Sequence, residues 1–177
     1  YNSLLLYHGL GVGKTCASIA IAEGFKSNRM VYILLNKSLK QNFIDNLMFC
    51  GNHMFRRNQH WIFKRTSGDI DFDKYASFIG IPAKVMKKNG GAWFVDFKQK
   101  ANYADLKKSE QDQLNFQIEG MIDMRYKFIH MDGLNNKSMQ KLLDDRVLDN
   151  AVLIVDEVHN ITNAMSKDTP GIRARGI

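Results

Sequence analysis

The strongest indication of the fold is the stretch Gly9-Leu10-Gly11-Val12-Gly13-Lys14-Thr15. It follows a short apolar run, Ser3 to Tyr7, and precedes a segment, Lys14 to Phe25, that is rich in Ala and Ile and lacks Pro. A strand, a glycine-rich turn and a helix in this order form the context of a phosphate-binding loop. Glycines let successive backbone N–H groups point at one anion, and the positive end of the helix attracts the same charge.

The residue types in this loop suit ATP and Mg²⁺. We expect Lys14 to contact the β- and γ-phosphates, and the Thr15 hydroxyl to bind Mg²⁺. The backbone expected to surround the phosphates belongs to Gly9, Leu10, Gly11, Val12 and Gly13. The full pattern begins with Gly six residues before the Lys, where this chain has His8. The three glycines that follow supply the same flexibility.

A second stretch ends in a pair of carboxylates. The apolar run Ala151 to Val155 leads directly into Asp156 and Glu157. In open α/β sheets, ligands bind at the carboxyl ends of the strands. At such a place one acid holds Mg²⁺ and a neighbouring base orients the attacking water, so we assign these roles to Asp156 and Glu157. An acidic pair alone would equally suit a solvated turn; the phosphate-binding loop upstream favours the catalytic interpretation.

The rest of the chain predicts an α/β fold, with a mainly parallel sheet covered by helices on both faces. Hydrophobic patterning indicates strands over 3–7, 30–35, 92–97, 126–131 and 151–155. It indicates helices over 14–25, from a Ser38 cap to about Gly51, and over 104–124 and 137–143. Residues 51–124 interrupt the regular alternation, and we interpret them as an insertion packed on the core.

Composition bounds the class of protein. The chain has 177 residues, 45% of them hydrophobic, which argues against disorder and suits one domain or part of one. Its net charge of +7 is concentrated in residues 51–127, with 14 Lys and Arg against nine Asp and Glu, which favours phosphate or acidic partners. No apolar run is long enough for a membrane span. Because the chain begins with Tyr1, we expect a piece of a longer protein.

The two motifs together resemble those of superfamily 2 helicases and translocases. Asp156-Glu157-Val158-His159 is similar to their motif II, and Gly9 to Thr15 is similar to their motif I. The resemblance implies that residues 1–177 are part of an N-terminal RecA-like lobe that uses ATP and Mg²⁺. It implies that His159 couples the ATP site to a second RecA-like lobe, which is absent from this chain.

The same resemblance implies contacts with DNA or RNA. In that superfamily a nucleic-acid-contacting loop follows the second strand, and its place here is taken by Asn36, Lys37, Ser38 and Gln41, without the usual Pro-Thr pair. Another such loop would follow Phe128 to Met131 at Asp132. The third motif and the arginine fingers of the family are absent, and neither Arg173 nor Arg175 is identified as a finger. We therefore expect this piece alone to bind ATP weakly and hydrolyse it poorly.

Within the superfamily, the chain resembles the helicase-type ATPases of nucleocytoplasmic large DNA viruses. That group includes the poxvirus early transcription factor small subunit and nucleoside triphosphatase I. The features that carry the likeness are the segment Leu4 to Gly9, the segment Asp156 to Asn160 and the long insertion. The likeness implies a helicase or DNA translocase serving viral transcription with transcription-complex proteins. Its implied location is intracellular: the host cytoplasm, in viral factories, and the virion.

Two other functions remain open at this point. One is another P-loop motor, such as a DNA-packaging ATPase, in which the Val158-His159 pair has no meaning. The other is a structural subunit of a transcription complex with a vestigial ATPase. A third motif and a second lobe in the full-length protein would support the helicase. Unchanged activity of the complex after Lys14→Ala would support the structural subunit.

Two weaker patterns concern the insertion and the cysteines. Cys50, His53 and His60 offer too few ligands for zinc, so we interpret them as a small buried thiol and surface imidazoles. With only two Cys, the chain is not a disulfide-stapled secreted scaffold and suits a reducing compartment. Basic and aromatic residues alternate between Arg56 and Arg65, a segment that either contacts nucleic acid or packs its aromatics inward: Arg56, Arg57, His60, Trp61, Phe63, Lys64 and Arg65.

Overall fold

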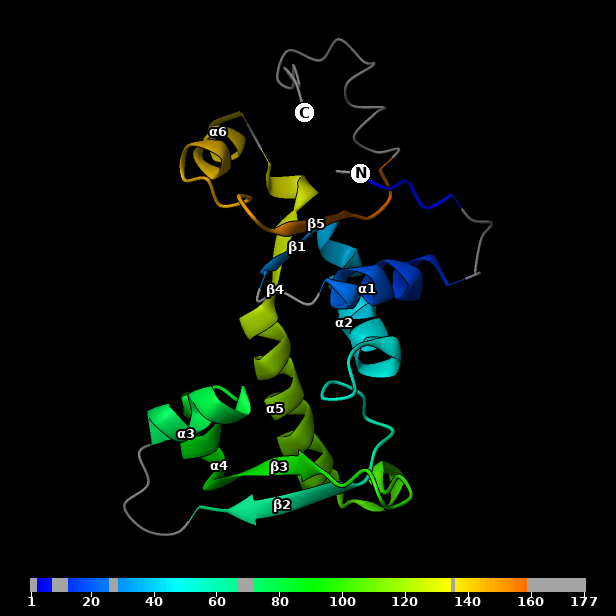
Figure 1. Ribbon diagram of the computed structural model, residues 1–177, viewed down its shortest axis with the longest axis vertical. Coiled ribbons are helices and arrows are strands. Elements are labelled where there is room, and N and C mark those ends of the chain that lie inside the picture. The colour runs from blue at the N-terminus through cyan, green and yellow to red at the C-terminus, as the bar shows by residue number, and fades with distance from the viewer. Residues whose placement is uncertain (1–2, 8–12, 26–28, 67–71, 135, 159–177) are drawn as a thin grey trace.

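The centre of the molecule is a parallel sheet with strand order β4-β1-β5 (Figure 1). The computed structural model describes residues 3–7, 13–25, 29–66, 72–134 and 136–158. The strands are β1 (Val31–Leu35), β4 (Tyr126–His130) and β5 (Val152–Val155). β4 and β5 each pair in parallel with β1, so the carboxyl ends of the three strands meet at one edge of the sheet. The chain is thus a mixed α/β protein, as predicted.

Two helices pack together beside this sheet. They are α1 (Lys14–Gly24) and α2 (Lys40–Cys50), and α6 (Asn136–Asp144) lies between β4 and β5 in the chain. The predicted inner face of α2 is confirmed, because Phe43, Ile44 and Leu47 are buried. The predicted Ser38 cap is wrong. Ser38 lies within a short 3₁₀ turn, η1 (Lys37–Leu39), because this turn precedes the α-helix and moves its first residue to Lys40.

Residues 51–124 form the lower half of Figure 1. An antiparallel pair of strands, β2 (Trp61–Arg65) and β3 (Gly91–Val95), makes a ribbon, with α3 (Phe72–Ile79) and α4 (Ala83–Asn89) between the two strands in the chain. A 3₁₀ turn, η2 (Tyr103–Asp105), and the long helix α5 (Lys108–Arg125) follow. The strand predicted over 92–97 is present as β3, whereas β2, α3 and α4 were not predicted.

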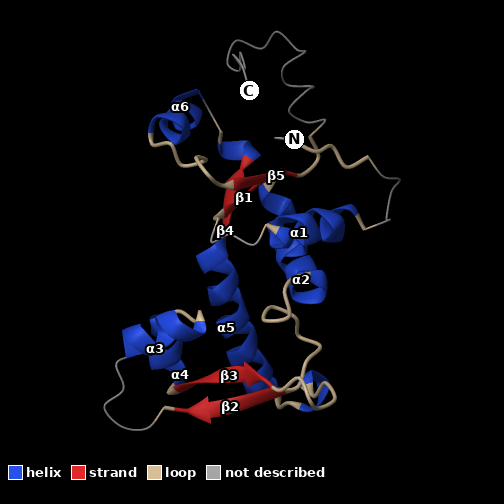
Figure 2. Cartoon of the chain, in the orientation of Figure 1, coloured by secondary structure: helices blue, strands red, loops and turns tan. Residues whose placement is uncertain are grey.

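Helix α5 connects the ribbon to the parallel sheet (Figure 2). Its predicted apolar face is confirmed: Leu114, Ile118, Met121 and Ile122 are buried. The helix ends at Arg125 and the chain continues at once as β4. The buried side chains of the sheet, α5 and the ribbon belong to one hydrophobic cluster. The two halves of the molecule therefore share a core.

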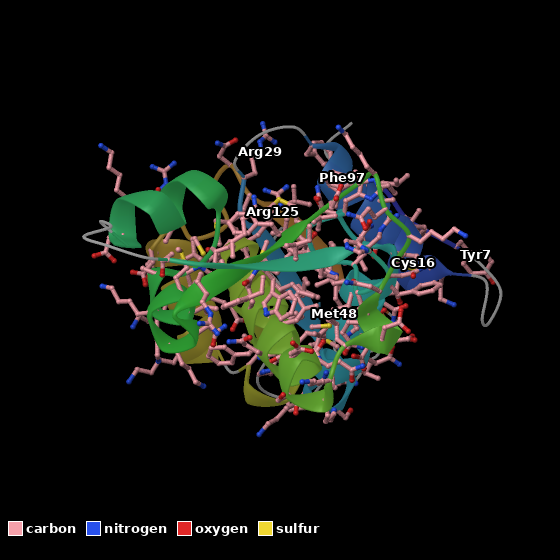
Figure 3. All side chains as sticks on the ribbon, turned by 90° about the horizontal axis from the view of Figure 1, so that it is seen from below. Tyr7, Cys16, Arg29, Met48, Phe97 and Arg125 are labelled. Carbon is pink, nitrogen blue, oxygen red and sulfur yellow. A yellow bond between two sulfur atoms is a disulfide. The ribbon has the colours of Figure 1, made fainter. Side chains whose placement is uncertain are left out.

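The junction between α5 and β4 is tied to the last turn of α1. Tyr126 is only 1% exposed, and its hydroxyl donates a hydrogen bond to the Glu23 carboxylate. Burial, together with this carboxylate, raises the pKa of Tyr126 well above its ordinary value. Arg125 lies 3.9 Å from the same carboxylate and donates to the backbone oxygen of Arg29 at 3.3 Å (Figure 3). The junction is thus bonded both to Glu23 of α1 and to Arg29, just before β1.

Two amide side chains close the outer edges of the ribbon. Gln117 accepts from the backbone N–H of Trp93 at 2.8 Å and donates to its backbone oxygen at 2.8 Å. Asn102 does the same for Trp61, at 2.8 and 3.1 Å. Each amide takes the place that a neighbouring strand would fill, because it offers one acceptor and one donor to one residue.

Two sequence-based expectations about the sheet are wrong. Ser3 to Tyr7 does not form a strand, and Leu4, Leu5 and Tyr7 are 68%, 72% and 92% exposed. An apolar run becomes a strand only where it finds a backbone partner, and the described sheet pairs only β4, β1 and β5. β5 is not fully buried, because it is at the end of that sheet and Leu153 is 41% exposed.

The expectation of a free Cys50 thiol is also wrong. Cys16 and Cys50 form a disulfide, with their Cα atoms 5.8 Å apart. Cys16 lies in the first turn of α1 and Cys50 ends α2 (Figure 3). The packing of α1 on α2 brings the two residues together, and the spacing of two cysteines in a sequence does not reveal such a contact.

Candidate functional site

The described part of the predicted phosphate-binding loop is its junction with α1. Gly13 has φ +81°, a left-handed conformation that favours glycine, and its carbonyl accepts the first helical hydrogen bond from Ala17 at 2.9 Å. Lys14 and Thr15 then form the first turn of α1. Gly9, Leu10, Gly11 and Val12 lie outside the described residues, so their contact with phosphate stays a prediction.

The carboxylate pair follows β5 at the carboxyl edge of the sheet. The Asp156 N–H donates to the Leu34 carbonyl at 2.9 Å, which extends the pairing with β1 by one residue. The Glu157 N–H donates to the Asp156 carboxylate at 3.1 Å. Glu157 has φ 53°, which is uncommon for a residue with a side chain. Such backbone strain concentrates at functional sites.

Lys14 and Asp156 come from distant parts of the chain and lie within electrostatic reach of each other. Burial, the Glu157 charge and the Lys14 charge all act on Asp156. The first two raise its pKa above the ordinary value of 3.8, whereas the backbone N–H of Glu157 and the Lys14 ammonium oppose the rise. A half-buried carboxylate beside a second carboxylate is a place where a cation is stabilised.

The donor set fits Mg²⁺. Thr15 and Asp156 supply a hydroxyl and a carboxylate, and Mg²⁺ is commonly held by one or two carboxylates together with substrate phosphates. Among the described residues no cluster of three or more His, Cys, Asp or Glu could hold a metal without a substrate. His159, the predicted coupling residue, lies outside the described residues.

Two of the predicted nucleic-acid residues line one cavity. The cavity has a volume of about 440 Å³, and Lys37, Gln41 and His130 are part of its wall. The loops after β1 and β4 are joined there, since the Lys37 N–H donates to Asp132 at 3.0 Å. The Nδ1 atom of His130 is buried without a hydrogen-bond partner. The structure places Asn36 and Ser38 beside this cavity in the chain, but not in its wall.

Sequence reasoning missed four residues in the wall of this cavity: Lys40, Ile44, Glu119 and Asp123. The two acids come from α5, where they are four residues apart and share one helical face. Their spacing is visible in the sequence, but nothing there indicates that α5 lies next to α2.

The basic and aromatic segment from Arg56 to Arg65 is mostly structural. Arg56 donates to the backbone oxygen of Gly51 at 2.6 Å, and Arg57 donates to Asn115 at 2.9 Å. His60 contacts the backbone oxygen of Lys100 at 2.8 Å, and Trp61 is 3% exposed. Of the basic members, Lys64 and Arg65 stay exposed.

Two proteins of Acanthamoeba polyphaga mimivirus, each named "Putative ATP-dependent RNA helicase", are similar to this chain. One is 51% identical over 43 residues, which are 24% of this chain and 8% of that protein. The other is 26% identical over 181 residues, which cover 92% of this chain and 14% of that protein. The chain therefore corresponds to a small part of each relative.

No protein-family model and no solved structure matches the chain. The parallel three-stranded sheet is compatible with a RecA-like lobe. Within the described residues no helix is both long and apolar enough to cross a membrane.

Proposed function

We propose that this chain is part of the ATP-binding lobe of a nucleic-acid-dependent ATPase, of the superfamily 2 helicase or translocase type. The single observation that carries the proposal is that Asp156 follows β5 at the carboxyl edge of the parallel sheet, within electrostatic reach of Lys14 in the first turn of α1. A phosphate-binding lysine and a metal-binding carboxylate must lie near each other to act on one ATP. The similarity to two proteins named as helicases supports the same function.

Each residue has a distinct role in this proposal. Lys14 and the N–H groups from Gly9 to Gly13 bind the β- and γ-phosphates of ATP, helped by the positive end of α1. Thr15 and Asp156 hold Mg²⁺, which when bound neutralises charge on the phosphates. Glu157 accepts a hydrogen bond from the attacking water and orients it toward the γ-phosphate.

The nucleic acid is expected at the loops after β1 and β4. Lys37 and Gln41 line the cavity there, and Asn36 and Ser38 flank it. A lysine and amide side chains suit phosphate and sugar contacts, which position a strand without reading its sequence. The relatives are named as RNA helicases, and the viral resemblance favours a role in transcription, with DNA as the second possible substrate.

The organisation of the whole protein is also a proposal. Residues 1–177 would form part of an N-terminal RecA-like lobe, and residues 51–124 would be its insertion. The relatives are much longer than this chain, which leaves room for a second lobe that completes the ATP site. His159 would then transmit the state of the ATP site to that lobe.

The experiment is ATP hydrolysis by the full-length protein, with and without single- and double-stranded DNA and RNA. We expect one nucleic acid to stimulate hydrolysis strongly. We expect Glu157→Gln to lower kcat by about 10²–10⁴-fold, because the amide cannot accept the proton that the carboxylate attracts. ATP binding should survive in this variant.

A matched control is Asp105→Asn, which replaces an exposed carboxylate in η2, away from the candidate site, and should leave the ATPase rate unchanged. Hydrolysis that is indifferent to every nucleic acid would contradict a helicase and favour another P-loop motor. A complex whose activity survives Lys14→Ala would favour a structural subunit.

A further inference from the structure

The described strands and helices of the insertion lie at the end of the molecule opposite α1 and β5 (Figure 1). A second cavity is lined by residues of the ribbon, α4 and α5. Its volume is about 480 Å³, within the range of roughly 300–1,000 Å³ that is usual for small-molecule sites. The ribbon contributes Phe63, Arg65 and Trp93, the end of α4 contributes Asn89, and α5 contributes Gln113. We call it the ribbon cavity. None of the roles proposed above uses it.

An aromatic wall forms one side of the ribbon cavity. The rings of Phe63 and Trp93 lie 5.2 Å apart with an interplanar angle of 58°. Trp93 is 4% exposed, and its indole N–H donates to Gln113 of α5 at 3.2 Å, so burial and this hydrogen bond hold the ring in place. Phe63 is only partly buried. The free surface of Phe63 is therefore a rigid platform on which a flat ring can stack.

A hydrogen-bonding atom without a partner belongs to the wall of this cavity. The Nδ2 atom of Asn89 is buried and makes no hydrogen bond with a described residue. The Oγ1 atom of Thr66 is also buried without such a bond, and the Thr66 N–H donates to the Gly90 carbonyl at 3.2 Å, but Thr66 is not part of the wall. Buried polar atoms are rarely left unpaired, so a ligand or water is expected to supply their partners. An amide donor pairs readily with the edge of a nucleobase.

The charges around the ribbon cavity favour a phosphate on one side. Arg65 is exposed at the end of β2 and makes no ion pair with a described residue. Glu110 is in the wall, but its carboxylate accepts the Lys107 N–H at 2.9 Å and caps α5. A phosphate is thus attracted to the Arg65 side and repelled from the Glu110 side. A stacking ring, an unpaired amide and a free guanidinium together suit one nucleotide.

We propose that the ribbon cavity binds one unpaired base of a single-stranded nucleic acid. The base stacks on Phe63 and accepts a hydrogen bond from Asn89, and the adjoining phosphate contacts Arg65. Stacking on aromatic side chains is how proteins hold single strands without strong sequence preference. The inference rests on the proposed function, because it supplies a second contact for the same strand, far from the loops after β1 and β4.

The test measures the affinity of the full-length protein for a fluorescently labelled single-stranded RNA or DNA by anisotropy. Phe63→Leu should weaken binding by roughly 5- to 100-fold, the usual range for loss of one stacked base. Arg65→Gln should weaken binding and reduce the slope of log affinity against log salt concentration by about one. Asn89→Ala removes the unpaired amide at the end of α4 and should weaken binding as well.

Matched controls come from the other end of β3. Phe97 is 71% exposed, so Phe97→Leu removes an aromatic ring from the same insertion, and Lys98→Gln removes the same charge as Arg65→Gln. Both should change affinity less than twofold. With an abasic oligonucleotide, wild type and Phe63→Leu should bind equally, because no base remains to stack.

Two outcomes separate this inference from the proposed function. Wild-type binding that Phe63→Leu and Asn89→Ala weaken no more than their controls would overturn the ribbon cavity as a base site and mean that water fills it. The nucleic-acid-dependent ATPase would stand in that case. A wild-type protein that binds no nucleic acid, and whose hydrolysis ignores it, would overturn both.

Discussion

The parallel sheet and the ribbon satisfy their outer edges in different ways. In the ribbon, the backbone of Trp61 is bonded by Asn102 and that of Trp93 by Gln117. The parallel sheet ends, within the described residues, at β5, where Leu153 is exposed, and the chain turns through the left-handed Glu157. The outer edges of the ribbon are thus bonded by side chains of the segment before η2 and of α5. The candidate carboxylates Asp156 and Glu157 instead lie where the regular structure of the sheet stops.

This difference indicates how the two regions divide stability and chemistry. The buried amide Gln117 and the apolar face of α5 hold the ribbon, whereas Asp156 is charged at a cost because it is half-buried beside Glu157. Functional sites commonly carry such local strain, and the remaining structure must compensate for it. Substitutions in the ribbon should therefore change unfolding, and substitutions at the carboxyl edge should change catalysis.

The largest expected effect is catalytic. Lys14→Ala should lower ATP hydrolysis of the full-length protein by on the order of 10²–10³-fold, because it removes a cation from the phosphates. The thermal unfolding midpoint should stay close to that of wild type. The control is Lys108→Ala, whose side chain is 81% exposed on α5, and which should leave both quantities unchanged. Loss of folding in Lys14→Ala would contradict the division between stability and chemistry.

Reduction of the disulfide should give the next largest effect. Cys16 and Cys50 are 34 residues apart, and closing a loop of this length stabilises the folded state by roughly 3–4 kcal/mol. A thiol reductant should lower the denaturant midpoint accordingly. Cys50→Ala should show the lower midpoint with and without reductant. An equal response of wild type and Cys50→Ala to reductant would mean that the disulfide does not form in solution.

Loss of the Gln117 amide should have a smaller effect, confined to stability. Gln117→Leu leaves the Trp93 N–H and carbonyl unpaired in a buried place, which should cost about 2–3 kcal/mol. Urea unfolding measures this cost. Gln99→Leu serves as the control, because Gln99 is exposed in the turn after β3 and its amide bonds only Asp96. ATP hydrolysis without nucleic acid should be the same in both variants.

The smallest expected effect concerns the charge on Asp156. Burial and Glu157 raise the pKa of Asp156, so its charged form disfavours the folded state. Without ATP and Mg²⁺, Asp156→Asn should therefore raise the unfolding midpoint slightly at neutral pH. This gain should shrink as the pH falls through the raised pKa, where wild-type Asp156 becomes protonated. Titration of the midpoint against pH checks the sign. In the presence of ATP and Mg²⁺ the variant should be the less stable of the two.

Sequence patterns predicted those parts of the fold that depend on local periodicity. The apolar faces of α2 and α5 and the strands β1 and β4 follow directly from the spacing of residues such as Phe43 and Ile118. Strand β2 was not predicted, because its last two residues, Lys64 and Arg65, are charged and leave an apolar run of only three residues. The Cys16–Cys50 bond and the shape of both cavities depend on contacts between distant segments, which no local pattern contains.

For the candidate site, the sequence correctly placed Asp156 and Glu157 at the end of a strand, β5, whereas the strand expected over 3–7, before the glycine-rich stretch, is not formed. The sequence did not indicate that Asp156 is half-buried or that Glu157 adopts a left-handed conformation. These properties arise from the packing of β5 on β1 and α1, so only the assembled structure reveals them.

The bonds at Glu23, Arg125 and Tyr126 have a mechanical consequence. They join α1, which begins at the predicted phosphate-binding loop, to the C-terminal end of α5, a helix about 27 Å long at 1.5 Å per residue. If α5 follows a rotation of α1 by about 5°, the far end of this helix moves by roughly 2 Å, taking the ribbon with it. In this geometry a small rotation about Tyr126 at one end of α5 becomes a larger displacement of the ribbon at its other end.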